Sequence, residues 1–268
     1  MKNALVIWKW SLLTALRSQL ALLALAAVMA VWGFGAYRWL WFPAEGSGLT
    51  LIVGLIWALA QWALLAAFLA SAVTSANSTV SAGATSIALR TLGSFNVRQW
   101  LRCVVFVLLA ALVVLAIREA FSRANNYSLE VASFLTFRSE HPVHPVTVEK
   151  VFWVIEMLLW IAVGGFLLGF LNALVRHGWR ASAKSVARLL ANACWRSTFV
   201  TTLVSWIVFG SLAYLLATWH PKVSPGFADY AQALLRLGVA LVLGVVGWLF
   251  WVLSLARLNL PGDESPAP

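Results

Sequence analysis

Charged side chains are scarce in this chain. They make up 10% of the 268 residues, whereas hydrophobic residues make up 62%. Soluble globular domains carry about 25% charged residues, and a fold in water buries most of its large apolar side chains. The composition therefore excludes an ordinary soluble domain and predicts an integral membrane protein.

Acidic residues are scarcer still, with 9 Asp and Glu against 19 Lys and Arg, which gives a net charge of +10. In a soluble protein this excess would suggest a nucleic-acid partner. Here the bases lie between apolar runs, where lipid head groups and membrane topology explain them better. We therefore expect no nucleic-acid partner.

Cysteine and histidine are also rare. Cys103 and Cys194 belong to different segments without a CxxC pair, so we expect packing residues and no disulfide. No histidine lies inside a predicted span, which argues against a buried haem. His141 and His144 could meet His220 around a metal, but prolines follow the first two and no acid or cysteine completes a site. We expect exposed loop histidines, and neither metal nor cofactor.

Catalytic signatures are absent as well. The sequence contains no GxSxG, no HExxH, no Walker loop and no paired carboxylates in a context that would poise them. A membrane enzyme usually needs several polar residues at one depth, and the predicted spans offer few. We therefore predict that the chain is not an enzyme, with a membrane-embedded lipid enzyme as the weakest of three alternatives.

Long apolar runs dominate what is present. A membrane span needs about 20 mostly apolar residues, and six stretches qualify: 20–42, 49–73, 101–117, 151–175, 198–218 and 231–256. The first is too long for the 7–15-residue core of a signal peptide, so we interpret it as a retained span. These runs predict an all-α polytopic membrane protein with one transmembrane domain, 1–260, an outer loop, 118–150, and a disordered tail, 261–268.

The distribution of bases predicts the orientation, because Lys and Arg accumulate on the cytosolic side. Segments 1–19, 74–102 and 176–197 hold eleven bases and no acid: Lys2, Lys9, Arg17, Arg90, Arg98, Arg102, Arg176, Arg180, Lys184, Arg188 and Arg196. The alternate connections carry the acids Glu45, Glu119, Glu130, Glu140, Glu149 and Asp229. Both termini are therefore expected in the cytosol, with the bacterial inner membrane as the predicted location.

Tryptophans agree with this layout, since their rings favour the head-group level. We assign Trp39, Trp41, Trp153 and Trp219 to the outer boundary, and Trp8, Trp10, Trp100, Trp179, Trp195, Trp248 and Trp251 to the inner one.

A basic pair eight residues apart precedes each odd-numbered span: Lys9 with Arg17, Arg90 with Arg98, and Arg188 with Arg196. Eight residues is close to two helical turns, so each pair would lie on one face of a helix. This pattern predicts three amphipathic helices on the cytosolic leaflet, each opening a repeated unit of interfacial helix, span, outer loop and span. Alternatively, positive-inside selection alone places bases before these spans.

The connections carry weaker signals. Residues 43–48 predict a tight turn between antiparallel spans one and two. Residues 128–138 predict a short helix on the outer leaflet, broken by the two His-Pro steps at 141–145. Glycines on spans four and six, namely Gly165, Gly169, Gly238, Gly244 and Gly247, predict close helix packing, and the amides of Gln61 and Asn172 predict interhelical hydrogen bonds.

This layout, with its three basic pairs, resembles the membrane domain found on some bacterial glycerophosphodiester phosphodiesterases and kindred six-helix families. The resemblance covers nearly the whole chain. The soluble phosphodiesterase barrel of that family is absent here, so no catalytic residue is carried over. The resemblance implies a non-catalytic membrane module.

Glu156, inside span four, is the most suggestive polar residue, because an ionisable group at that depth often marks a transport path. A structural pairing with Arg38, Arg118 or Arg236 near the outer boundary is the alternative. Two functions follow. The leading one is a non-enzymatic membrane scaffold or accessory subunit whose six paired bases contact anionic lipid or partner subunits. The competitor is a transporter or permease component that uses Glu156.

Overall fold

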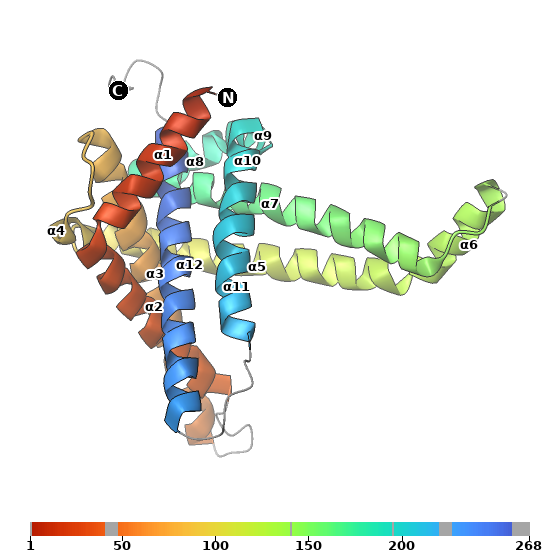
Figure 1. Ribbon diagram of the computed structural model, residues 1–268, viewed down its shortest axis with the longest axis horizontal. Coiled ribbons are helices and arrows are strands. Elements are labelled where there is room, and N and C mark those ends of the chain that lie inside the picture. The colour runs from red at the N-terminus through yellow and green to blue at the C-terminus, as the bar shows by residue number, and fades with distance from the viewer. Residues whose placement is uncertain (1, 41–47, 140, 195, 220–226, 259–268) are drawn as a thin grey trace.

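The computed structural model describes residues 2–40, 48–139, 141–194, 196–219 and 227–258, and these form helices without any strand (Figure 1). The helices are α1 (Lys2–Arg17), α2 (Gln19–Leu40), α3 (Gly48–Ser81), α4 (Leu89–Leu92), α5 (Val97–Asn126), α6 (Ser128–Ser139), α7 (Pro145–His177), α8 (Trp179–Lys184), α9 (Val186–Ala193), α10 (Arg196–Val204), the π-helix η1 (Ser205–Gly210), α11 (Ser211–Thr218) and α12 (Phe227–Leu258). Outside the described residues lie Trp41, Glu45, Glu140, Trp195, His220, the tail at 261–268 and, except for Gly48, the turn at 43–48.

The six predicted spans are confirmed. Six helical stretches in the described residues are long and apolar enough to cross a membrane: Gln19–Arg38, Gly48–Ser81, Val97–Asn126, Pro145–His177, Ser197–Thr218 and Asp229–Leu258. The chain is thus all-helical, with the composition of an integral membrane protein.

The third span differs most from its predicted limits. We expected the shortest run, 101–117, but α5 has 30 residues. It starts early because Asn96 forms a capping box with Gln99: the Asn96 side chain accepts from the Gln99 amide at 2.8 Å, and the Asn96 amide donates to Gln99 Oε1 at 2.9 Å. It continues past the apolar run because Arg123 Nε pairs with Glu119 Oε1 one turn away, at 2.8 Å.

The expected outer loop, 118–150, is therefore mostly helical. The short helix predicted at 128–138 is confirmed as α6, which packs against α7. The Ser128 hydroxyl lies 3.2 Å from Glu149 Oε1, and the Val143 amide donates to Thr136 Oγ1 at 2.9 Å across the break between α6 and α7. Polar side chains end the apolar runs here without ending the helices, which explains the difference.

The helices lie in two directions (Figure 1). α2, α3, the α10–η1–α11 segment and α12 run between the same two ends of the molecule, and α12 contacts each of the others. α5 and α7 lie side by side across the direction of α12 and carry α6 at their far end. We call these three helices the arm.

α12 is the central helix. In the most apolar 18-residue stretch of its span, 67% of the residues are buried inside the protein. The corresponding share in the other five spans is 11–28%. It packs against α1, α2, α3, α7 and α11. Small residues allow the helices to approach closely, above all on α3, where Ala66, Ala70, Ala72 and Ala76 are fully buried.

The predicted glycine contacts hold at three positions. A Cβ on Gly165 would lie 3.2 Å from Thr202 Oγ1, one on Gly169 would lie 3.7 Å from Leu189 Cδ2, and one on Gly247 would overlap the Phe209 Cβ. At Gly238 and Gly244 an added Cβ would meet nothing within 4 Å, so these two do not mark close packing.

The threefold repeat is not confirmed. The order of elements matches it, since α1, α4 and α8–α9 each precede a pair of spans. The units nevertheless differ in structure: α1 has 16 residues, α4 has 4, and α8 and α9 have 6 and 8. The second pair of spans also forms the arm, across the direction of the other two pairs (Figure 1).

Candidate lipid-contacting surface

α1 buries several small side chains, packs Trp10 and Leu12 against the core, and exposes other large apolar side chains. Ser11, Thr14, Ala15 and Ser18 are at most 3% exposed, on the side that packs along α12 and α2. The opposite side exposes Leu5, Val6, Leu13 and Leu16, together with Lys9 and Arg17. In water this arrangement would be inverted, because large apolar side chains are the ones that folding removes from solvent. Folding in water therefore does not account for the exposed side of α1.

Hydrogen bonds fix α1 in this orientation. Trp8 Nε1 donates to Thr201 Oγ1 on α10 at 2.8 Å. At the other end, the Ser18 hydroxyl donates to the Thr14 carbonyl at 2.5 Å and accepts from the Ile87 amide at 2.7 Å. The bonds of Trp8 and Ser18 thus tie the middle of α1 to α10 and its C-terminal end to the segment before α4, and favour the orientation in which Leu5, Leu13 and Leu16 face outward.

The C-terminal end of α12 is tied to the same helix. The Arg257 guanidinium carbon lies 4.5 Å from the centroid of the Trp10 ring, which is a cation–π contact. Arg257 therefore remains near the exposed surface of α1, where it adds to the positive charge.

The second basic pair does not lie on one helix. Arg90 belongs to α4 and Arg98 to the first turn of α5, because the chain leaves the helical conformation at Gly93 and starts again after the cap at Asn96. The expectation of a single amphipathic helix is wrong here. Both arginines are exposed, and Leu89 beside them is 51% exposed.

The third pair is divided as well. Arg188 lies exposed on α9, next to Leu190, which is 53% exposed. α9 ends at Ala193, and Arg196 begins α10 with its side chain outside the described residues. Of the three pairs, only Lys9 and Arg17 lie on one helix.

The basic elements nevertheless gather in one region. α1, α8, α9 and the beginning of α10 lie at the end of the molecule where α12 terminates (Figure 1). α4 lies next to the junction of α1 and α2, where the Ile87 amide reaches Ser18. We call the exposed parts of α1, α4, the first turn of α5, and α9 the basic surface.

The bases on this surface are not neutralised by neighbouring acids. Five of the six side chains are described and exposed: Lys9, Arg17, Arg90, Arg98 and Arg188. Across the described part of the chain, none of these five forms a salt bridge, and the ion pair that is present lies on the arm, between Arg123 and Glu119. Unpaired bases beside exposed leucines match the chemistry of an anionic membrane surface.

Arg102 has a different role. Its Nη1 donates to the Leu174 carbonyl in the last turn of α7 at 3.3 Å, where a cation also compensates the helix dipole. The next residue after α7, Gly178, has a φ of +81°, and a Cβ there would lie 2.8 Å from Arg102 Nη2. Arg102 is therefore a structural residue that joins α5 to the end of α7.

Glu156 lies half-buried on the arm. Its Oε1 accepts a hydrogen bond from Trp160 Nε1 on the next turn, at 3.2 Å. None of the predicted partners, Arg38, Arg118 and Arg236, forms a salt bridge with it in the described structure. It also lines neither of the two cavities described below.

The two described loop histidines have no metal-binding group around them among the described residues. His141 and His144 are exposed on the segment between α6 and α7. In the described ranges, no group of three or more His, Cys, Asp or Glu residues is placed to hold a metal ion.

Several tryptophans assigned to the inner boundary turn inward instead. Trp251 is 8% exposed and donates from Nε1 to Thr202 Oγ1 at 3.1 Å. Trp100 donates to the Ala63 carbonyl at 3.1 Å. Of the tryptophans assigned to the outer boundary, Trp153 and Trp219 are 62% and 59% exposed, and their place at a head-group boundary stays a prediction.

Sequence reasoning missed the buried hydroxyls. Ser75, Thr201, Thr202 and Ser254 are fully buried. Their signal was the recurrence of Ser and Thr at helical spacing, such as Ser71, Ser75 and Thr79 on α3. The expected interhelical bonds of the two amides are not seen at Gln61 Oε1 and Asn172 Oδ1, which are buried without a hydrogen-bond partner among the described residues.

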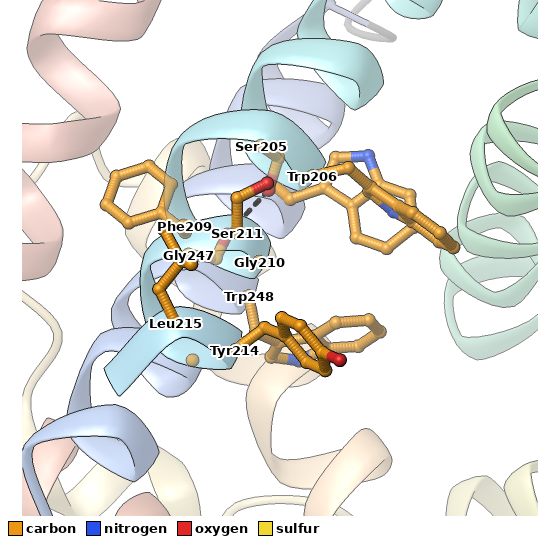
Figure 2. A pocket seen from close by; sticks show the side chains of 11 residues that line it. Ser205, Trp206, Phe209, Gly210, Ser211, Tyr214, Leu215, Gly247 and Trp248 are labelled. Atoms are coloured by element: carbon orange, nitrogen blue, oxygen red, sulfur yellow. Dashed lines mark hydrogen bonds between the residues drawn. The ribbon is translucent and has the colours of Figure 1, made fainter. Parts of the chain in front are cut away.

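Two cavities lie between described helices. The smaller, about 240 Å³, lies between α2 and α3 beside Gln61. The larger, about 740 Å³, lies between the η1–α11 segment and α12 (Figure 2).

Comparison of the chain with protein-family models, with curated proteins and with solved structures found no match. The resemblance to the membrane domain of glycerophosphodiester phosphodiesterases thus stays a prediction. The geometry alone characterises the chain: six apolar helices and an unneutralised basic surface whose neighbouring side chains are apolar.

Proposed function

We propose that this chain is a non-enzymatic integral membrane scaffold or accessory subunit whose basic surface binds anionic lipid head groups on the cytosolic leaflet. The proposal includes a location in the bacterial inner membrane with both termini in the cytosol. It requires no cofactor and no nucleic-acid partner.

The observation that carries it is the orientation of α1. Leu5, Leu13 and Leu16 face outward, while Ser11 and Thr14 face inward, so the helix is suited to lie in the head-group region with its exposed apolar side in the acyl chains. Lys9 and Arg17 stand on the exposed side, where long side chains reach up to phosphates.

The remaining bases extend this contact. Arg90, Arg98 and Arg188 are exposed without a salt bridge among the described residues, so no acid has to be displaced before a phosphate binds. Bases near an anionic leaflet each contribute about fivefold to the binding constant at physiological salt. A partner subunit with an acidic face would use the same chemistry, and the test separates the two.

The test uses two double variants of the full-length chain, Arg90→Glu with Arg98→Glu and Arg188→Glu with Arg196→Glu. The matched control is Arg118→Glu with Arg138→Glu, two exposed arginines near the far end of the arm. Native mass spectrometry of the detergent-purified chain measures the preference for phosphatidylglycerol over phosphatidylcholine. Resistance to alkaline extraction shows that each variant is inserted.

We expect the preference to fall about fivefold for each base removed in the first two variants, and to stay unchanged in the control. An unchanged preference in all three variants would refute lipid binding by the basic surface. If a co-purifying protein were lost from the first two variants while the lipid preference remained, a partner subunit would replace lipid as the ligand.

A further inference from the structure

The larger cavity is a groove between the fifth and sixth spans. It has a volume of about 740 Å³ and lies between η1, α11 and α12 (Figure 2). This volume is within the range of about 300–1,000 Å³ that is usual for small-molecule sites. Five of its lining residues are aromatic: Trp206, Phe209, Tyr214, Trp248 and Trp251. It contains none of the bases of the basic surface.

The π-helix shapes this groove. The Ser211 amide donates to the Trp206 carbonyl five residues back, so the turn is wider than an α-helical one. The Ser205 hydroxyl fixes the turn to α12 by donating to the Gly247 carbonyl at 3.1 Å. In Figure 2 the Trp206 and Phe209 side chains leave η1 on opposite sides. Single wide turns of this kind recur at functional sites in helices.

Glycines keep the groove open. Gly210 on η1 and Gly244 on α12 both line it, and at each an added Cβ would meet nothing within 4 Å. Side chains at these two positions would occupy the space that the groove now offers.

The groove is continuous with the lipid-facing surface of the fifth span. Trp206, Tyr214 and Leu215 at its edge are 45%, 68% and 59% exposed, on a helix apolar enough to cross a membrane. Water is not stable in so apolar a space, since it would find too few polar partners. The surrounding hydrocarbon is therefore what fills it.

We propose that the groove binds one acyl chain of a membrane phospholipid. A flexible acyl chain can follow the uneven wall that Trp248 and Trp251 form, since their rings meet at 85° with their centroids 5.4 Å apart. Lipid tails are as apolar as the groove, so binding depends on close contacts with these walls rather than on escape from water.

The first experiment fills the groove. Gly244→Phe is compared with Gly238→Phe, which lies on the same helix at a position that also has open space but does not line the groove. The full-length chain is purified in mild detergent after reconstitution with phosphatidylcholine, whose head group carries no net charge for the basic surface to attract. Native mass spectrometry counts the retained lipids.

We expect the wild type and Gly238→Phe to retain one phospholipid that Gly244→Phe loses. Gly210→Phe, from the opposite wall, should lose it as well. Equal retention in all variants, or a ring compound in place of a phospholipid, would overturn the proposal. The doubly charge-reversed variants should keep this lipid, so the groove and the basic surface are tested separately.

A second measurement needs no substitution. A phosphatidylcholine with a photoreactive diazirine in its acyl chain is crosslinked to the wild-type chain in proteoliposomes, and the adducts are mapped by peptide mass spectrometry. Adducts on Trp206 and Tyr214 should exceed those on Leu112, which is 63% exposed on the arm and meets only ordinary bilayer lipid. Equal labelling at the three positions would contradict a bound chain.

Discussion

The substitution Gly247→Ala tests the packing of the fifth span on the central helix. The added Cβ would overlap the Phe209 Cβ and would lie 2.8 Å from Phe209 Cγ. Neither atom is the free end of a flexible side chain, so η1 and α12 have to move apart. Overpacking of this kind costs about 1–3 kcal/mol. The Ser205 bond to the Gly247 carbonyl, 3.1 Å long, would be stretched by the same movement.

Gly238→Ala is the matched control on the same helix. Its Cβ meets nothing within 4 Å, so alanine should stabilise the helix by about 0.5–1 kcal/mol through its higher helix propensity. The two variants and the wild type are purified in one detergent and heated. The apparent melting temperature of each is the temperature at which its monodisperse peak in size-exclusion chromatography is half lost.

We expect Gly247→Ala to melt below the wild type and Gly238→Ala at or above it. If Gly247→Ala were as stable as Gly238→Ala, the close approach of η1 to α12 would be wrong. The groove proposal would lose its geometric basis with it.

Three further predictions follow from single residues. Gly178→Ala should destabilise the chain by about 1–3 kcal/mol, because a φ of +81° with a ψ of 178° is a conformation for glycine and the new Cβ would crowd Arg102. The control is Gly93→Ala, where φ is −92° and the space is open. Equal melting temperatures of the two variants would contradict this prediction. Cys194 is exposed and Cys103 is buried, so a membrane-impermeant maleimide should label one thiol per chain. This labelling should occur only in vesicles whose cytosolic face points outward. Labelling of Cys194 in right-side-out vesicles would contradict the proposed orientation. Glu156→Gln should leave the proton flux into proteoliposomes unchanged, because Glu156 accepts a hydrogen bond from Trp160 and lines neither cavity. A measurable loss of this proton flux would instead support the transporter alternative.

Hydropathy located the spans well because length and apolarity are local properties of the sequence. The limits of α5 were harder, since its extension depends on a capping box at Asn96 and on the pair between Glu119 and Arg123 beyond the apolar run. Neither changes the mean hydropathy. The helix therefore extends beyond the run by which it was recognised.

The candidate site was only partly predictable. The bases were visible as an acid-free pattern, but the separation of Arg90 from Arg98 depends on a helix start at Asn96. The inverted face of α1 could not be deduced, because its direction is set by bonds to Thr201 and Ile87, distant in sequence. The groove depends on a π-turn and on two open glycines, and neither has a distinctive sequence signal.

The arm also has a mechanical consequence. On α5 the last buried residue is Val107, and the helix continues beside α7 to Asn126. At about 1.5 Å per residue, those 19 residues make a lever of about 28 Å, so a rotation of about 10° at its base displaces the far end by about 5 Å. Small adjustments where Arg102 meets the end of α7 are thereby magnified several-fold at α6.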